Sequence, residues 1–106
     1  MRNFKIGDVL EQSMAFDQSY FEFLRVPTMS LGIYRLPAGS QDMQEPHKQD
    51  EVYYIQQGRA EIEVEGDSLL VGPGNIIFVP AFAKHRFKEI SEDLEVLVFF
   101  APAEGE

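Results

Sequence analysis

The regular alternation of apolar and acidic residues between positions 59 and 65 most constrains the fold of this chain. Three apolar residues alternate there with three glutamates: Ala60, Ile62 and Val64 with Glu61, Glu63 and Glu65. Period-two alternation places one kind of side chain on each face of a β-strand. Gly66-Asp67 then turns the chain, and residues 68–71 return as the second strand of a hairpin. The segment therefore predicts a sheet with one buried and one solvated face.

Other segments add short strands and almost no helix. Further strands are predicted at residues 20–26, 28–36, 51–55, 76–79, 85–87 and 94–100, in a chain punctuated by glycine and proline. Asp8-Val-Leu-Glu11 fits a capping box, which predicts a helix of one or two turns starting there. The tail from Ala101 onward is expected to fray. The pattern indicates an all-β sandwich or barrel forming a single domain over residues 1–106.

Composition limits the partners of such a domain. Eighteen acidic and nine basic residues give a net charge of −9, which repels nucleic acid and anionic membrane surfaces. The chain has no cysteine, so disulfides and thiolate metal sites are excluded. No apolar run approaches the ~20 residues needed to span a bilayer. The N-terminus lacks the apolar core of a signal peptide, so a cytoplasmic location is expected.

The two histidines of the chain both lie in segments rich in potential ligands. Glu45, His47 and Glu51 are spaced by even numbers, so an extended backbone would project all three to one face. Pro46 favours that extended conformation at the residue before it. If hairpins return His85 to the same place, two imidazoles and one or two carboxylates surround one cavity. This is the ligand set of iron, manganese, nickel or zinc, and it predicts one divalent metal ion.

The same alternation predicts which side chains line the cavity. Tyr53 should follow Glu51 on the inward face, Phe87 should share a face with His85, and Tyr34 should reach inward. Tyr53 and Phe87 also suit plain core packing, because small barrels are filled by side chains. A small, partly aromatic cavity of this kind suits a small organic ligand.

Residues 39–89 resemble the two conserved motifs of the cupin superfamily. The first motif reads Gly, five residues, His-x-His, three or four residues, Glu, six residues, Gly. The matching positions here are Gly39, Glu45, His47, Glu51 and Gly58. The second motif reads Gly, five residues, Pro-x-Gly, two residues, His, three residues, Asn. The matching positions are Gly74, Pro80, Phe82, His85 and Glu89. The resemblance implies a double-stranded β-helix, or jelly-roll barrel, with a motif-bearing core over 39–89.

Three positions depart from these motifs. Glu45 replaces a histidine, Phe82 a glycine and Glu89 an asparagine. The resemblance implies metal ligation by His47, Glu51 and His85, with Glu45 as a further ligand. Without Glu45, the remaining two-histidine, one-carboxylate face suits Fe(II) and oxygen chemistry. With it, two negative ligands neutralise a dication and favour Mn or Fe over Cu.

Three functions follow from a metal site in a small barrel. The preferred hypothesis is a dioxygenase-like, metal-dependent enzyme acting on a small organic molecule. The alternatives are an isomerase that uses the metal as a Lewis acid, and a non-catalytic module that binds a small molecule or metal. A DNA-binding regulator is excluded by the charge and by the lack of a helix-turn-helix segment. A homodimer is also expected, with strands 20–26 and 94–100 covering each other's edges.

Overall fold

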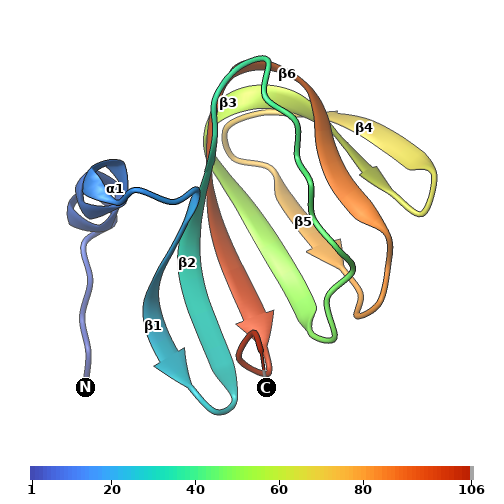
Figure 1. Ribbon diagram of the computed structural model, residues 1–106. Coiled ribbons are helices and arrows are strands. Elements are labelled where there is room, and N and C mark those ends of the chain that lie inside the picture. The colour runs from blue at the N-terminus through green and yellow to red at the C-terminus, as the bar shows by residue number, and fades with distance from the viewer. Residues whose placement is uncertain (106) are drawn as a thin grey trace.

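The computed structural model describes residues 1–105, which form one helix and a six-stranded antiparallel sheet (Figure 1). Its elements are α1 (Ile6–Ala15), β1 (Tyr20–Val26), β2 (Met29–Leu36), β3 (Asp50–Val64), β4 (Asp67–Val71), β5 (Ile76–Val79) and β6 (His85–Ala101). The strand order is β1-β2-β6-β3-β4. β5 pairs with residues 51–54 of β3, on the same edge of that strand as β4 and opposite β6. The predicted all-β fold, with at most a short N-terminal helix, is confirmed.

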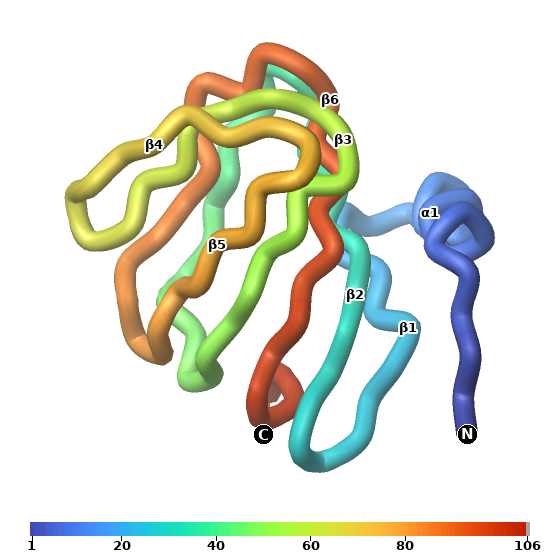
Figure 2. Tube along the Cα trace, turned by 180° about the vertical axis from the view of Figure 1, so that it is seen from behind, coloured from blue at the N-terminus to red at the C-terminus, as the bar shows by residue number. Residues whose placement is uncertain are grey.

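Two long strands fold this sheet over on itself. β3 and β6 pair from Asp50↔Ala101 to Val64↔His85, and both arch over the top of the molecule in Figures 1 and 2. Their register shifts three times between Ile55 and Glu61. Gly58 lies in this bend with φ 99°, and a Cβ there would lie 2.2 Å from the carbonyl oxygen of Asp93. Only glycine fits so close an approach of two backbones.

The structure corrects the predicted strand boundaries. The segments 51–55 and 59–65 were expected as separate strands but belong to the single strand β3. In the same way, 85–87 and 94–100 are the two halves of β6. A glycine in the first case and an acidic stretch in the second suggested breaks in the sequence. Because β3 and β6 bend together, the ladder between them continues through the bend.

The helix prediction was wrong in its start. α1 begins at Ile6, two residues before the predicted cap, and its N-cap residue Lys5 makes no side-chain capping bond. Asp8 therefore lies inside the first turn, where its negative charge favours the helix N-terminus without capping it. Among the described residues, no helix has the length and apolar character to cross a membrane.

The inner face of the folded sheet carries the core. Tyr53, Ile55, Ile62 and Phe87 are each no more than 2% exposed and belong to one apolar cluster. Burial along β3 alternates from Glu51 to Ile55 and again, out of phase, from Gly58 to Ile62, which confirms that Tyr53 and Ile55 share the inward face of Glu51. The opposite face is acidic and pairs in part with basic side chains of β6, as in the 2.9 Å contact between Arg86 and Glu63.

The expected dimer required a free strand edge at residues 94–100, and the position of β6 in the sheet leaves none. Residues 94–100 pair with β2 on one side and with β3 on the other, so they have no free edge. β1 is an edge strand, and its aromatic side chains contact the chain's own N-terminal region: Phe16 packs on Phe21, and Phe4 on Phe23. The two strands therefore cannot cover each other in the way the sequence suggested.

Residues 103 and 104 of the C-terminal tail bind the β1–β2 turn, contrary to the expected fraying, while the last residue of the tail lies outside the described residues. Ala103 is fully buried, and its N–H donates to the carbonyl oxygen of Pro27 at 3.4 Å. The N–H of Glu104 donates to the Ser30 hydroxyl at 3.0 Å. These bonds hold the end of the chain beside the open end of the folded sheet (Figure 1). Burial of a small side chain, which no periodic pattern signals, fixes the tail.

Candidate metal centre

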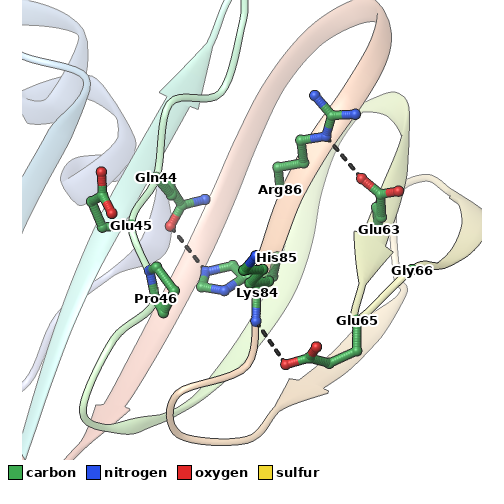
Figure 3. Close-up of a pocket in the computed structure, with 9 residues that line it drawn as sticks. All are labelled: Gln44, Glu45, Pro46, Glu63, Glu65, Gly66, Lys84, His85 and Arg86. Atoms are coloured by element: carbon green, nitrogen blue, oxygen red, sulfur yellow. Dashed lines mark hydrogen bonds and ion pairs between the residues drawn. The ribbon is translucent and has the colours of Figure 1, made fainter.

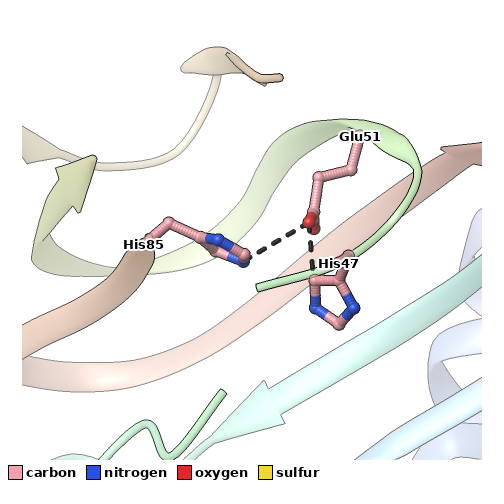
Figure 4. Close-up of side chains that lie close together, drawn as sticks. All are labelled: His47, Glu51 and His85. Atoms are coloured by element: carbon pink, nitrogen blue, oxygen red, sulfur yellow. Dashed lines mark ion pairs between the residues drawn. The ribbon is translucent and has the colours of Figure 1, made fainter. Parts of the chain in front are cut away.

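Three side chains from distant parts of the chain converge in the interior. His47 comes from the loop before β3, Glu51 from the start of β3 and His85 from the start of β6 (Figure 4). The Glu51 Oε2 atom lies 3.3 Å from His85 Nε2 and 3.8 Å from His47 Nε2. One potential ligand atom from each residue lies within 4.8 Å of the other two. The sequence spacing and the sheet register thus bring these three side chains together.

Glu51 is the most unusual member of this group. It is 2% exposed, and neither carboxylate oxygen has a hydrogen-bond partner among the described residues. Burial raises the pKa of this carboxyl, while the nearby Tyr53 hydroxyl and His85 oppose the shift. A buried carboxylate without partners is strongly disfavoured unless a cation or a proton compensates it.

The imidazoles are oriented to receive a cation. His85 Nδ1 lies 2.9 Å from the carbonyl oxygen of Ala83, which only accepts, so Nδ1 carries the proton. With a proton on Nδ1, the Nε2 atom of His85 faces the cluster. Burial, followed by the proximity of His85, lowers the pKa of His47, which favours its neutral form. Two neutral imidazoles and one carboxylate are a suitable ligand set for a divalent metal.

Glu45 does not join this group. Its side chain is exposed, and Figure 3 shows it pointing away from His85. Residues 41–47 form no strand, so the period-two alternation used to place Glu45 beside His47 does not apply to them. The neighbouring side chain takes the place expected for it: Gln44 Oε1 lies 3.1 Å from His47 Nε2 and 3.3 Å from His85 Nε2.

A cavity of about 180 Å³ adjoins the three residues. Its lining consists of Tyr20, Tyr34, Gln44, His47, Glu51, Tyr53, Val98, Phe100 and Glu104. Tyr34 and Tyr53 thus lie where the sequence placed them. Phe87 is not in this lining and packs behind Tyr53, with ring centroids 5.0 Å apart. The volume equals that of about six water molecules in the liquid, so the cavity suits a small ligand.

Sequence reasoning missed five cavity residues, of which three are polar: Tyr20, Gln44 and Glu104. Tyr20 fits because it lies over Gly32, where a Cβ would come within 2.3 Å of its ring. Glu104 comes from the ordered tail, and its Oε2 lies 3.5 Å from His47 Nδ1. Burial, then the charge of Glu22, raises the pKa of Glu104, while Arg25 opposes the shift. Gln44 could have been considered from the sequence, because a side-chain amide next to the motif offers an oxygen atom that can act as a ligand, as a carboxylate does.

A second, wider groove of about 500 Å³ lies outside the cluster. It is lined by Gln44, Glu45, Pro46, Glu63, Glu65, Gly66, Lys84, His85 and Arg86 (Figure 3). Its polar groups are largely paired with one another: Arg86 bonds Glu63, and the Lys84 N–H donates to Glu65, both at 2.9 Å. Arg86, Glu63 and Glu65 already have partners in this groove, whereas the Glu51 carboxylate has none among the described residues, so we place the functional site in the smaller cavity beside Glu51.

Comparison with known proteins identifies the family. A family model described as the cupin domain matches residues 32–100, well over half of the chain. The chain belongs to the cupin family. A Streptomyces coelicolor protein, named only as uncharacterized protein SCO3923, is 45% identical over 105 residues, which cover 99% of this cupin and 100% of that protein. The family predicted from residues 39–89 is therefore confirmed.

Solved structures share the fold of this cupin. DMSP lyase DddQ from Ruegeria pomeroyi is 26% identical with a TM-score of 0.67; the match covers 72% of this cupin but only 39% of that chain. TT1209 from Thermus thermophilus has a TM-score of 0.75 at 23% identity, covering 97% and 99% of the two chains. KdgF from Halomonas has a TM-score of 0.71 at 23% identity, covering 78% and 76%. The last two show a common fold alone.

Proposed function

We propose that His47, Glu51 and His85 hold one divalent metal ion, and that this cupin is a metal-dependent enzyme acting on a small organic molecule. Dioxygenase-like chemistry is the preferred reaction class. The observation that carries the proposal is the buried Glu51 carboxylate, which has no hydrogen-bond partner within residues 1–105 and faces two imidazole nitrogens. A divalent cation would compensate this charge and use both lone pairs.

The donor set suits oxygen chemistry. A two-histidine, one-carboxylate face, when loaded with Fe(II), supplies open positions at which oxygen and substrate can meet. The protein's own groups would do the rest. Phe100 and Val98 give the cavity an apolar wall that excludes water, and Tyr53 is buried beside the cluster to fix the substrate's orientation. Among iron, manganese, nickel and zinc, this class of reaction favours iron.

A proton-transfer reaction, such as an isomerisation or an elimination, is the second candidate. The structure supplies a carboxylate that could act as base, because Glu104 lines the cavity and lies 3.5 Å from His47. A lyase, DddQ, is among the structures similar to this cupin. A non-catalytic module that binds a small molecule or metal is the remaining alternative, since one fold hosts many activities.

Metal analysis and oxygen uptake test the proposal. Protein purified without a histidine tag is expected to retain one metal ion per chain, and His85→Ala is expected to lose it. Equal metal content in both proteins would refute the ligand assignment. With Fe(II) loaded, oxygen consumption is expected with at least one member of a panel of catechols, thiols and β-diketones. If no compound of the panel causes oxygen consumption while the metal site is filled, the result would favour the binding module.

Assembly and location also stay proposals. A homodimer could form through the free edge of β1, the strand at one end of the sheet order. Light scattering that gives the mass of a single chain would exclude it. Fractionation of cells would test the cytoplasmic location.

A further inference from the structure

We propose that the side-chain oxygen of Gln44 is a fourth protein ligand of the metal ion. The inference rests on the metal site proposed above and extends it by a residue outside the family's motif positions. It replaces Glu45, which the motif spacing suggested for this role. Four observations support it: the fixed orientation of the amide, its distances to the imidazoles, the acceptors that gather around His85 Nε2, and the placement of Tyr53.

A buried carboxylate fixes the orientation of the Gln44 amide. Gln44 Nε2 donates to Asp42 Oδ2 at 2.7 Å. Asp42 is 7% exposed and also accepts the Tyr34 hydroxyl at 2.6 Å and the Phe87 N–H at 2.8 Å. A carboxylate anchored by two other donors can only accept from the amide, so the NH₂ group must face it. The amide oxygen is therefore directed at the two histidines.

The distances around this oxygen match those of ligand atoms sharing one ion. Gln44 Oε1 lies 3.1 Å from His47 Nε2 and 3.3 Å from His85 Nε2, and Glu51 Oε2 also lies 3.3 Å from His85 Nε2. With metal–ligand bonds of about 2.1 Å, neighbouring ligand atoms lie about 3.0 Å apart in an octahedron and about 3.4 Å apart in a tetrahedron. An ion could therefore be held without a large movement of these side chains.

While Glu51 is ionised, hydrogen bonding does not explain this arrangement at His85. Its Nδ1 proton is directed at the carbonyl oxygen of Ala83, so its Nε2 offers a lone pair. That lone pair faces two further acceptors, the Gln44 amide oxygen and the Glu51 carboxylate. Three acceptors directed at one another repel unless a positive charge lies between them. The Tyr53 hydroxyl donates to the same amide oxygen at 3.3 Å and leaves its second lone pair for the ion.

The proposed ligand sets the charge of the site. Two imidazoles, one amide and one carboxylate carry a single negative charge, so a bound dication keeps a net charge of +1. A site that used Glu45 would instead be neutral. The ion then acidifies a bound water or polarises a carbonyl more strongly than it would with two carboxylates. In six-coordinate geometry, two positions stay open for substrate and a second small molecule.

Co(II) binding to single variants tests the ligand. Gln44→Leu keeps the side-chain volume but removes the oxygen, so we expect Co(II) affinity to fall about tenfold or more, with a changed visible absorption spectrum. Glu45→Ala, in the adjacent residue, is the matched control and should bind within twofold of wild type with the same spectrum. If Gln44→Leu binds like wild type while Glu51→Gln loses the metal, the Gln44 assignment fails and the metal site stands. If wild type binds no Co(II), both fail.

A measurement on the wild-type protein avoids the effect of any substitution on folding. In protein labelled with ¹⁵N-glutamine, Zn(II) should shift the side-chain amide of Gln44 more than that of any other glutamine. An unchanged Gln44 side-chain resonance in zinc-saturated protein would overturn the proposal. A shift confined to Gln44 among the labelled glutamine side chains would support it.

Discussion

Replacing Glu51 by glutamine should stabilise the metal-free protein while abolishing its response to metal. The side chain of Glu51 is 1% exposed, and neither of its oxygens has a hydrogen-bond partner among residues 1–105. Glutamine has nearly the same shape without the charge. Its NH₂ group can also donate to the lone pair of His85 Nε2, which lies 3.3 Å from Glu51 Oε2. The substitution therefore removes a penalty from the folded protein.

The magnitude follows from the burial of an unsatisfied group. Leaving a buried polar group without partners costs about 1–3 kcal/mol, and more if it is charged. In a domain of 106 residues, about 1 kcal/mol shifts the melting temperature by about 4 °C. Metal-free Glu51→Gln should thus melt about 4–12 °C above metal-free wild type. Metal at 100 times its Kd should stabilise wild type by about 2.7 kcal/mol, and the variant hardly at all.

The pH dependence has a definite sign. Because burial raises the pKa of Glu51, the folded protein holds this proton to higher pH than the unfolded chain does. The stability of metal-free wild type should therefore fall as pH rises from the ordinary carboxyl pKa through the raised value. This contribution should be missing from the variant, so its advantage should grow with pH over that window.

Calorimetry with and without metal measures the melting temperature and the stabilisation by metal. Repeating it at several pH values measures the pH dependence. Glu61→Gln is the matched control, because it lies on the outer face of the same strand with only a 3.8 Å contact to Lys88. It should change stability by less than about 0.5 kcal/mol and keep the metal response. The reasoning is refuted if metal-free Glu51→Gln is less stable than wild type and still gains stability from metal.

Two further substitutions test other parts of the structure. Phe82→Gly should raise the free energy of unfolding by about 1 kcal/mol in a denaturant titration, because Phe82 has φ 67° and is 69% exposed; a loss of stability would show that its ring makes a necessary contact. Glu104→Ala should weaken metal binding about tenfold in a competition titration, because its carboxylate faces His47 Nδ1 at 3.5 Å. Unchanged affinity would exclude Glu104 from positioning the imidazole.

Two departures from the cupin motifs show that these motif positions reflect a backbone conformation. The family motif has glycine where this chain has Phe82 and asparagine where it has Glu89. Both residues adopt left-handed backbone conformations, with φ 67° and φ 48°. Glycine and asparagine are the residues that tolerate this region best. The motif positions therefore encode a backbone shape, which this chain keeps with less suitable side chains.

The sequence by itself determined whatever depends on short-range periodicity and motif spacing. Alternation within residues 51–55 and within residues 59–65 predicted which side chains of β3 face inward, and the motif spacing predicted that His47, Glu51 and His85 would meet. These features are local, because each strand needs only its own pattern to choose a face. The all-β class and the cupin family followed from the same signals.

Only the tertiary structure decided the features that depend on long-range contacts. Gln44 rather than Glu45 faces the histidines because its loop forms no strand and because Asp42, held by Phe87 of β6, anchors the amide. Glu104 reaches the cavity because the tail binds the β1–β2 turn. One of these contacts, between Ser30 and Glu104, joins residues 74 positions apart. No periodicity within either segment records them, since they arise only when the sheet has folded over.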